Sequence, residues 1–144
     1  MTYGQVAACY RHGHGDNPVL LQSAADVDTL IDELLASEPW ENMASLYSME
    51  RPSMTTGVPD HELWVGADGA RQVGVLGLMD DGNFVSLGPA NGRDEVAYGL
   101  MEHRREFPEN SEIPIALVRQ AVKEFLCSGG QRPTCIQWQE PEYW

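Results

Sequence analysis

Two segments of the chain have the apolar spacing of amphipathic helices. The first follows Ser23, a residue type favoured at helix N-caps, and stops before Pro39. Its apolar residues recur at intervals of three and four positions and form one stripe. These residues are Val27, Leu30, Ile31, Leu34 and Leu35. Asp26 and Asp28 fall in the first turn, where the positive end of the helix dipole favours acids.

The second helix is predicted to begin at Pro114 and to end at the Gly129–Gly130 pair. Proline is tolerated in the first helical turn, and glycine readily adopts the left-handed conformation that closes a helix. The residues of its apolar face are Leu117, Val118, Ala121, Val122, Phe125 and Leu126. Each helix therefore has one face to bury against another layer.

The other regular segments have the composition of short strands. They contain aromatic and β-branched residues and are separated by Gly, Asn, Asp or Pro. The predicted strands are Tyr3–Tyr10, Glu62–Ala67, Gln72–Met79, Asn83–Leu87, Glu95–Met101 and Thr134–Gln139. The turn sequences Asp80–Asn83 and Ala67–Ala70 predict that residues 62–87 form a three-stranded antiparallel meander. Long loops are predicted at 11–18, 37–44, 50–60 and 102–112.

This order of elements predicts the α+β fold class. We expect a single domain over residues 1–144, with a mainly antiparallel sheet and two amphipathic helices packed on one of its faces. A chain of 144 residues is long enough to bury a core of its own.

Composition adds a strong charge to this picture. The chain has 22 Asp and Glu residues against 9 Lys and Arg, which gives a formal charge of −13. Such an excess repels phosphate backbones and anionic lipid headgroups, so neither nucleic acid nor a membrane surface is the expected partner. A basic protein would instead be attracted.

The acids are unevenly distributed along the chain. Residues 12–50 include eight acids and neither Lys nor Arg. A second acidic group lies in the predicted loop before the second helix and consists of Glu102, Glu106, Glu109 and Glu112. Solubility alone does not require such an imbalance, because mixed charges would serve it as well. The pattern favours an acidic surface that speeds the capture of a basic protein.

Large aromatic residues are the second signal of an interface, since they dominate binding hot spots. Trp40 follows a proline in a predicted loop, and Tyr143–Trp144 ends the chain, so these are candidate contact residues. Trp64 and Trp138 fall in predicted strands and are expected in the core.

The cysteines and the lack of apolar runs indicate the compartment. Cys9, Cys127 and Cys135 are odd in number and widely spaced, which is typical of reduced thiols rather than a disulfide framework. No signal-peptide pattern is present at the N-terminus, and no segment approaches the roughly 18 apolar residues of a membrane span. We expect a cytoplasmic protein.

One short motif could carry chemistry. His12, His14 and Asp16 are spaced closely enough to surround a metal ion, but no further ligand stands at a recognisable spacing. A surface turn is the simpler interpretation, because Gly13 and Gly15 suit a turn after a strand. Neither a nucleophile-elbow nor a phosphate-loop motif occurs. We therefore expect no catalytic residue, no metal and no cofactor, and a metal-dependent hydrolase is a lesser alternative.

The C-terminal third carries motifs of a known family. They are Glu106–Pro108, Ser111–Pro114, Val118–Leu126, Gly129–Gly130, Arg132–Thr134 and Ile136–Trp138, with further agreement at Asp26–Ile31 and Val58–Leu63. With these motifs the chain resembles the actinobacterial branch of the Imm1-like immunity proteins of bacterial polymorphic toxin systems. The resemblance implies that Phe107, Pro108, Pro133 and Trp138 build the scaffold, and it supplies no catalytic residue.

The resemblance also implies a function. Such proteins are encoded beside secreted toxins, often nucleic-acid deaminases, and protect the producer by binding the toxin domain. A toxin that attracts nucleic acid needs a basic surface, which an acidic inhibitor would complement. An acidic regulator of a host nucleic-acid-binding protein is the alternative, and the oligomeric state is left open. The resemblance does not locate the binding surface. By charge and aromatic character, the predicted partner-binding residues are Trp40, Asp60, Asp80, Asp81, Glu102, Glu106, Glu109 and Trp144.

Overall fold

The structure is a computed structural model that describes residues 4–51, 57–90, 92–93 and 96–142. Its main sheet has eight strands, each paired antiparallel with its neighbours: β1 (Val6–Cys9), β2 (Val19–Leu21), β3 (Met43–Ser48), β4 (Glu62–Asp68), β5 (Val73–Met79), β6 (Asn83–Leu87), β9 (Ile113–Pro114) and β10 (Gln137–Gln139). The strands lie in the order β10-β6-β5-β4-β3-β1-β2, and β9 pairs with β5. A separate hairpin consists of β7 (Val96–Leu100) and β8 (His103–Phe107). The helices are α1 (Ala24–Leu35) and α2 (Ile115–Cys127).

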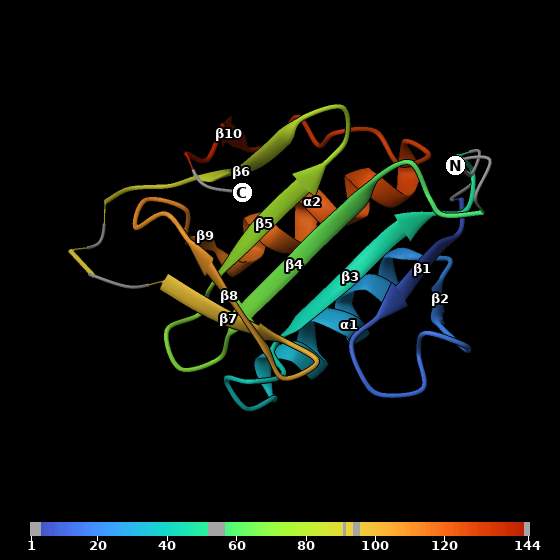
Figure 1. Ribbon diagram of the computed structural model, residues 1–144, viewed down its shortest axis with the longest axis horizontal. Helices are drawn as coiled ribbons and strands as arrows, with labels where there is room; N and C mark the ends of the chain where they lie inside the picture. The colour runs from blue at the N-terminus through green and yellow to red at the C-terminus, as the bar shows by residue number, and fades with distance from the viewer. Residues whose placement is uncertain (1–3, 52–56, 91, 94–95, 143–144) are drawn as a thin grey trace.

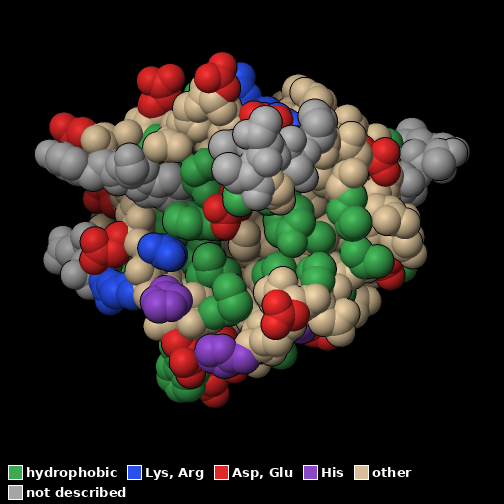
Figure 2. Space-filling view, turned by 45° about the vertical axis from the view of Figure 1, so that its right-hand side comes forward, with side chains coloured by type: hydrophobic (Ala, Val, Ile, Leu, Met, Phe, Trp, Pro, Cys, Tyr) green, Lys and Arg blue, Asp and Glu red, His purple; other side chains and the backbone are tan. Residues whose placement is uncertain are grey.

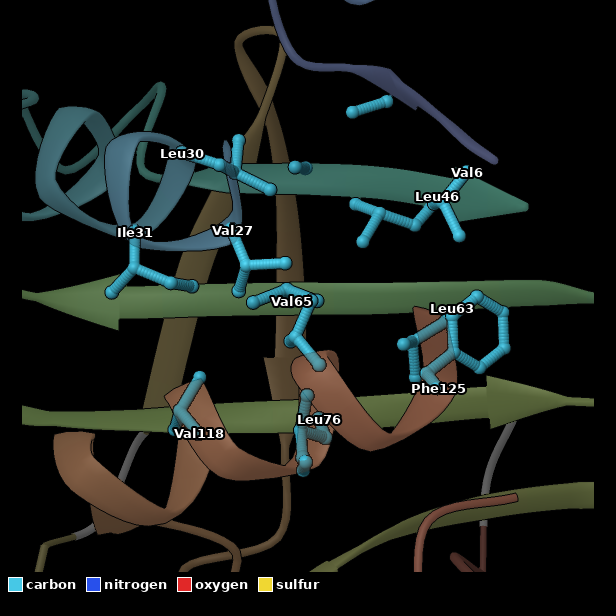
Figure 3. Close-up of a cluster of buried hydrophobic side chains, with 14 of the residues drawn as sticks. Val6, Val27, Leu30, Ile31, Leu46, Leu63, Val65, Leu76, Val118 and Phe125 are labelled. Atoms are coloured by element: carbon cyan, nitrogen blue, oxygen red, sulfur yellow. The ribbon is translucent and has the colours of Figure 1, made fainter. Parts of the chain in front are cut away.

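Both helices cover the same face of the sheet, as Figure 1 shows. The apolar stripe of α1 and that of α2 share one core with side chains of β1, β3, β4 and β5. Figure 3 shows Ile31 of α1 and Phe125 of α2 among strand residues such as Leu63. The predicted α+β class, the two helices and their common face are confirmed.

Polar contacts fix the helices in the positions that their apolar faces favour. The Ser23 side chain accepts a hydrogen bond from the Asp26 N–H at 3.2 Å, as expected of an N-cap. Between the helices, Asp28 accepts from Arg119 at 2.9 Å and from Lys123 at 3.0 Å. Part of the acidic charge of α1 is therefore neutralised by α2.

The hairpin β7–β8 packs across one end of the opposite face of the sheet (Figure 1). It forms a second, smaller core with residues of β3, β5 and β6, namely Met43, Val75, Val85, Val96, Tyr98, Leu100 and Phe107. A Cβ on Gly66 of β4 would lie 2.8 Å from the Tyr98 ring, so glycine is needed there for the hairpin to approach.

A buried carboxylate ties this hairpin to the rest of the fold. Glu112, whose side chain is 4% exposed, accepts a hydrogen bond from the Tyr98 hydroxyl at 2.6 Å. It also pairs with Arg71, in the β4–β5 turn, and with Arg93. Glu112 therefore stabilises the fold, although in the sequence it belongs to the acidic group of a predicted loop.

Several strands were missing from the sequence prediction. The predicted loop over 102–112 is wrong at β8, and β2, β3 and β9 were not predicted. The β7–β8 turn passes through Met101 and Glu102, whose φ angles of 48° and 72° are adopted without the Gly or Asn that usually signals such a turn. The β4–β5–β6 meander and its two turns are confirmed.

Other element boundaries differ for local reasons. The last strand begins at Gln137 rather than Thr134, because the Thr134 and Cys135 N–H groups donate to the Glu124 side chain on α2. The first and seventh strands are shorter than predicted, and Tyr3 and Glu95 lie outside the described residues.

The expected burial of two tryptophans is met only in part. Trp138 packs partly buried against the main core, whereas Trp64 packs against the smaller one, on the face opposite the helices.

Gly99→Ala tests how closely the hairpin is docked. The Gly99 N–H donates to the Asn42 side chain at 2.9 Å, and a Cβ there would lie 2.2 Å from the Trp40 backbone carbon. We expect the free energy of unfolding, measured by chemical denaturation, to fall by about 2 kcal/mol. Gly15→Ala is the control, since its Cβ would meet nothing within 4 Å. Equal stability of the two variants would contradict close docking.

Glu112→Gln tests the buried carboxylate. The amide keeps an acceptor for Tyr98 but loses the charge that Arg71 and Arg93 face, and both guanidinium groups can partly rehydrate. We expect a loss of about 2 kcal/mol in the free energy of unfolding. Glu109→Gln, at an exposed position of the same loop, should cost about 0.5 kcal/mol or less. A similar loss in both variants would show that the network does not stabilise the hairpin.

Candidate functional site

The hairpin leaves part of its face of the sheet uncovered, and two adjoining cavities lie there. The first has a volume of about 370 Å³ and the second of about 490 Å³, and Glu62 and Met79 line both. We call the two cavities together the Glu62 groove. The first is lined further by Ser45, Tyr47, Val58, Pro59, Asp60 and His61, and the second by Trp64, Asn83, Arg104, Arg105 and Glu106. Figure 2 shows hydrophobic side chains gathered on this side of the molecule, with acidic ones among and around them.

Strand alternation places Glu62 and Trp64 on the same face of β4. One oxygen of Glu62, Oε2, accepts hydrogen bonds from the Ser45 hydroxyl at 2.5 Å and from the Trp64 indole N–H at 2.8 Å. The Arg105 guanidinium lies over the Trp64 ring, 5.0 Å from its centroid. Within the described part of the chain, the second oxygen, Oε1, accepts no hydrogen bond and Glu62 pairs with no Lys or Arg.

His61 is held as a neutral imidazole in the wall of the first cavity. Its Nε2 accepts from the Ser48 backbone N–H at 2.8 Å, so the proton must be on Nδ1, which donates to Asp60 at 2.9 Å. The imidazole is 1% exposed. The hydrogen bond from His61 and the charge of Arg51 lower the pKa of Asp60 below its usual value.

Arg51 joins two of the predicted partner-binding residues. It forms a bidentate pair with Asp80 at 2.7 and 2.9 Å, and lies 3.3 Å from Asp60. Both oxygens of Asp60 thus have partners, one in His61 and one in Arg51. Asp80 hydrogen-bonds to the guanidinium through both of its oxygens.

All nine Lys and Arg residues of the chain are engaged within the fold. Seven pair with acids: Arg11, Arg51, Arg71, Arg93, Arg104, Arg119 and Lys123. The other two, Arg105 and Arg132, lie over the rings of Trp64 and Phe84. Since acids outnumber bases by thirteen, the surplus negative charge has no basic residue of this chain left to balance it.

The remaining predicted partner-binding residues lie at several places around the hairpin and the β5–β6 turn. Trp40 is 54% exposed, and its carbonyl accepts from the Glu102 N–H at the hairpin turn. Glu106 lines the second cavity. Asp81 and Glu109 are exposed, on the β5–β6 turn and after β8. Trp144 lies outside the described residues.

In the structure, a histidine of the His12–Asp16 segment accepts hydrogen bonds from the backbone just before it. Nδ1 of His14 accepts from the backbone N–H groups of Tyr10 and Arg11, at 3.2 and 3.1 Å. Among the described residues, which include His12 and Asp16, no three His, Cys, Asp or Glu side chains are arranged to hold a metal ion. The described residues therefore do not form the metal site that the sequence motif suggested.

Neither helix has the properties of a membrane-spanning segment. No helix in the described ranges is both long and apolar enough to cross a bilayer.

Glu62 was not among the residues predicted from sequence to bind a partner. The sequence shows only that Glu62 is an acid at the start of a predicted strand. Trp64 is the next residue on the same face of that strand. The contacts of Glu62 with Ser45 depend on the pairing of β3 with β4, and β3 was not predicted.

A known protein family matches the part of the chain that forms the Glu62 groove and the hairpin. No curated protein matches the chain. The sequence model of the family described as Immunity protein Imm1 matches residues 15–140, which include both helices, the Glu62 groove and the hairpin. The protein therefore belongs to the Imm1 family of immunity proteins, whose members act against toxins.

Proposed function

We propose that this protein binds a cognate toxin domain with one-to-one stoichiometry and blocks its active site, without turnover or cofactor. The observation that carries the proposal is the engagement of every basic side chain within the fold, which leaves a large negative surplus for a partner. The open Glu62 groove supplies a concave, partly apolar surface on which a protruding segment can dock.

The charge of the protein supports a toxin that acts on nucleic acid. An enzyme that acts on DNA or RNA needs a basic surface, because phosphate contacts supply most of its affinity for nucleic acid. A nucleic-acid deaminase additionally draws its target base into a pocket, so a bound protein that covers the pocket would stop the reaction. A net charge of −13 complements such a surface.

The two kinds of acid on the surface would contribute differently. Asp81, Glu102 and Glu109 are exposed, so they would act mainly on the approach of the partner through the long-range field. Aromatic Trp40, beside Glu102, would exclude water once the complex has formed. Acids that already hold an arginine, such as Asp80, would contribute less.

Neutralisation of a purified toxin tests the proposal directly. The C-terminal domain of the toxin encoded beside this gene would be titrated with the protein while deamination of single- and double-stranded nucleic acid is followed. We expect activity to reach zero at one equivalent, and calorimetry to give the same stoichiometry. Full toxin activity at saturating protein would contradict the proposal, and capture of a host nucleic-acid-binding protein instead would favour a regulatory role.

Salt dependence tests the electrostatic part. Between about 50 mM and about 500 mM salt, we expect the association rate constant to fall about tenfold or more, because exposed charges act on the encounter. The dissociation rate constant should change about twofold or less. Both can be measured by stopped-flow fluorescence of the complex. An association rate that does not respond to salt would show that the charge of the protein does not steer the toxin.

A further inference from the structure

We propose that the first cavity of the Glu62 groove is a receptor for one arginine side chain of the toxin, with Glu62 as its anchor. This inference rests on the proposed function, because it names the group of the partner that the groove takes. Binding of an arginine side chain by the cavity can be measured without the toxin.

The charges in the cavity select a cation. Among the described residues that line it, Asp60 and Glu62 are the acids, and none is Lys or Arg. The hydrogen bonds of His61 hold it as the neutral tautomer, and its ring is almost fully buried. The pairing of Asp60 with Arg51 weakens its attraction for a further cation.

Glu62 differs from Asp60 in how its oxygens are used. Ser45 and Trp64 both donate to Oε2, and neither carries a charge. In the described part of the chain Oε1 has no donor, so the full negative charge is available to a ligand. Hydrogen bonds hold the carboxylate in one orientation but do not neutralise its charge. It can therefore accept a charge-assisted hydrogen bond from a cation.

The carboxylate is already positioned before a ligand arrives. Ser45 on β3 and Trp64 on β4 hold it from two neighbouring strands, and the Trp64 ring is itself covered by Arg105. A partner would therefore pay little conformational entropy to order this side of the contact.

The walls of the cavity favour arginine over lysine. Tyr47, Val58, Pro59 and Met79 supply apolar surface for the methylene stem of a long side chain. A planar guanidinium can stack on the Tyr47 ring while its N–H groups reach a carboxylate. An ammonium group is more strongly hydrated and gains less in such a place.

The arginine must come from another kind of protein. Every basic side chain of this chain is engaged within its own fold, and two copies would each carry a charge of −13. Of the two cavities of the groove, Arg104 and Arg105 line the second and not the first, and there Arg104 pairs with Glu106 and Arg105 lies over Trp64. They leave the first cavity open to a cation.

The first experiment uses a small probe in place of the toxin. Nα-acetyl-arginine-methylamide would be titrated at millimolar concentration into the isotope-labelled protein, with the Trp64 indole N–H as the NMR reporter. We expect a saturable shift of that resonance, and none with the citrulline analogue, which has nearly the same shape but no charge. The shift should disappear in Glu62→Gln. An equal response to citrulline, or an unchanged response in the variant, would overturn the inference.

The second experiment uses the toxin domain encoded beside the gene. Glu62→Gln retains an oxygen for Ser45 and Trp64, so the free energy of unfolding should be unchanged within about 0.5 kcal/mol. We expect the variant to bind the toxin about tenfold or more weakly, mainly through faster dissociation. Glu140→Gln makes the same charge change at an exposed position and should alter affinity about twofold or less.

The outcomes separate this inference from the proposed function. If the unaltered protein and both variants bind the toxin equally, the arginine receptor is wrong and the proposed function stands. If the unaltered protein does not bind the toxin, the proposed function fails, and the arginine titration alone decides whether the cavity binds guanidinium.

Discussion

The arrangement of this molecule depends on the buried carboxylate of Glu112. It accepts from Tyr98 of the hairpin and pairs with Arg71 of the β4–β5 turn and with Arg93, so three segments meet at one charge. Removing a carboxylate from water is costly unless donors surround it, and this requirement holds the segments together. The hairpin is thereby held across one end of the sheet, and the Glu62 groove lies on the part of that face that the hairpin does not cover.

A second constraint is the small number of basic residues. Nine Lys and Arg serve a fold with 22 acids, and all nine are used to neutralise acids or to cover aromatic rings. Internal pairing therefore sorts the acids into two groups. Asp80 and Glu112 stabilise the fold through their arginines, whereas Glu62 and Asp81 pair with no Lys or Arg among the described residues. Under the proposed function, the second group is the one that a basic toxin would meet.

The elements that could be predicted from sequence are those with a strong local signal. Helix α1 begins where Ser23 caps it, and the β5–β6 turn lies at the Asp80–Asn83 sequence that predicted it. Strand β8 was missed because its residues, His103–Phe107, are mostly charged and solvent-facing, and because its turn lacks glycine. The residues predicted to bind the partner were chosen by charge and exposure. Charge alone could not distinguish Asp60, which pairs with Arg51, from Glu62, which pairs with no Lys or Arg in the described part of the chain.

The sequence by itself determined the α+β class, the two amphipathic helices, the central meander, the net charge and the family motifs. These properties depend on residue type and on spacing over a few turns or strands, and such signals are local. Only the tertiary structure decided which acids are neutralised, where the hairpin packs and where the groove opens. Each of these follows from contacts between residues far apart in sequence, such as Arg51 with Asp80 and Arg71 with Glu112.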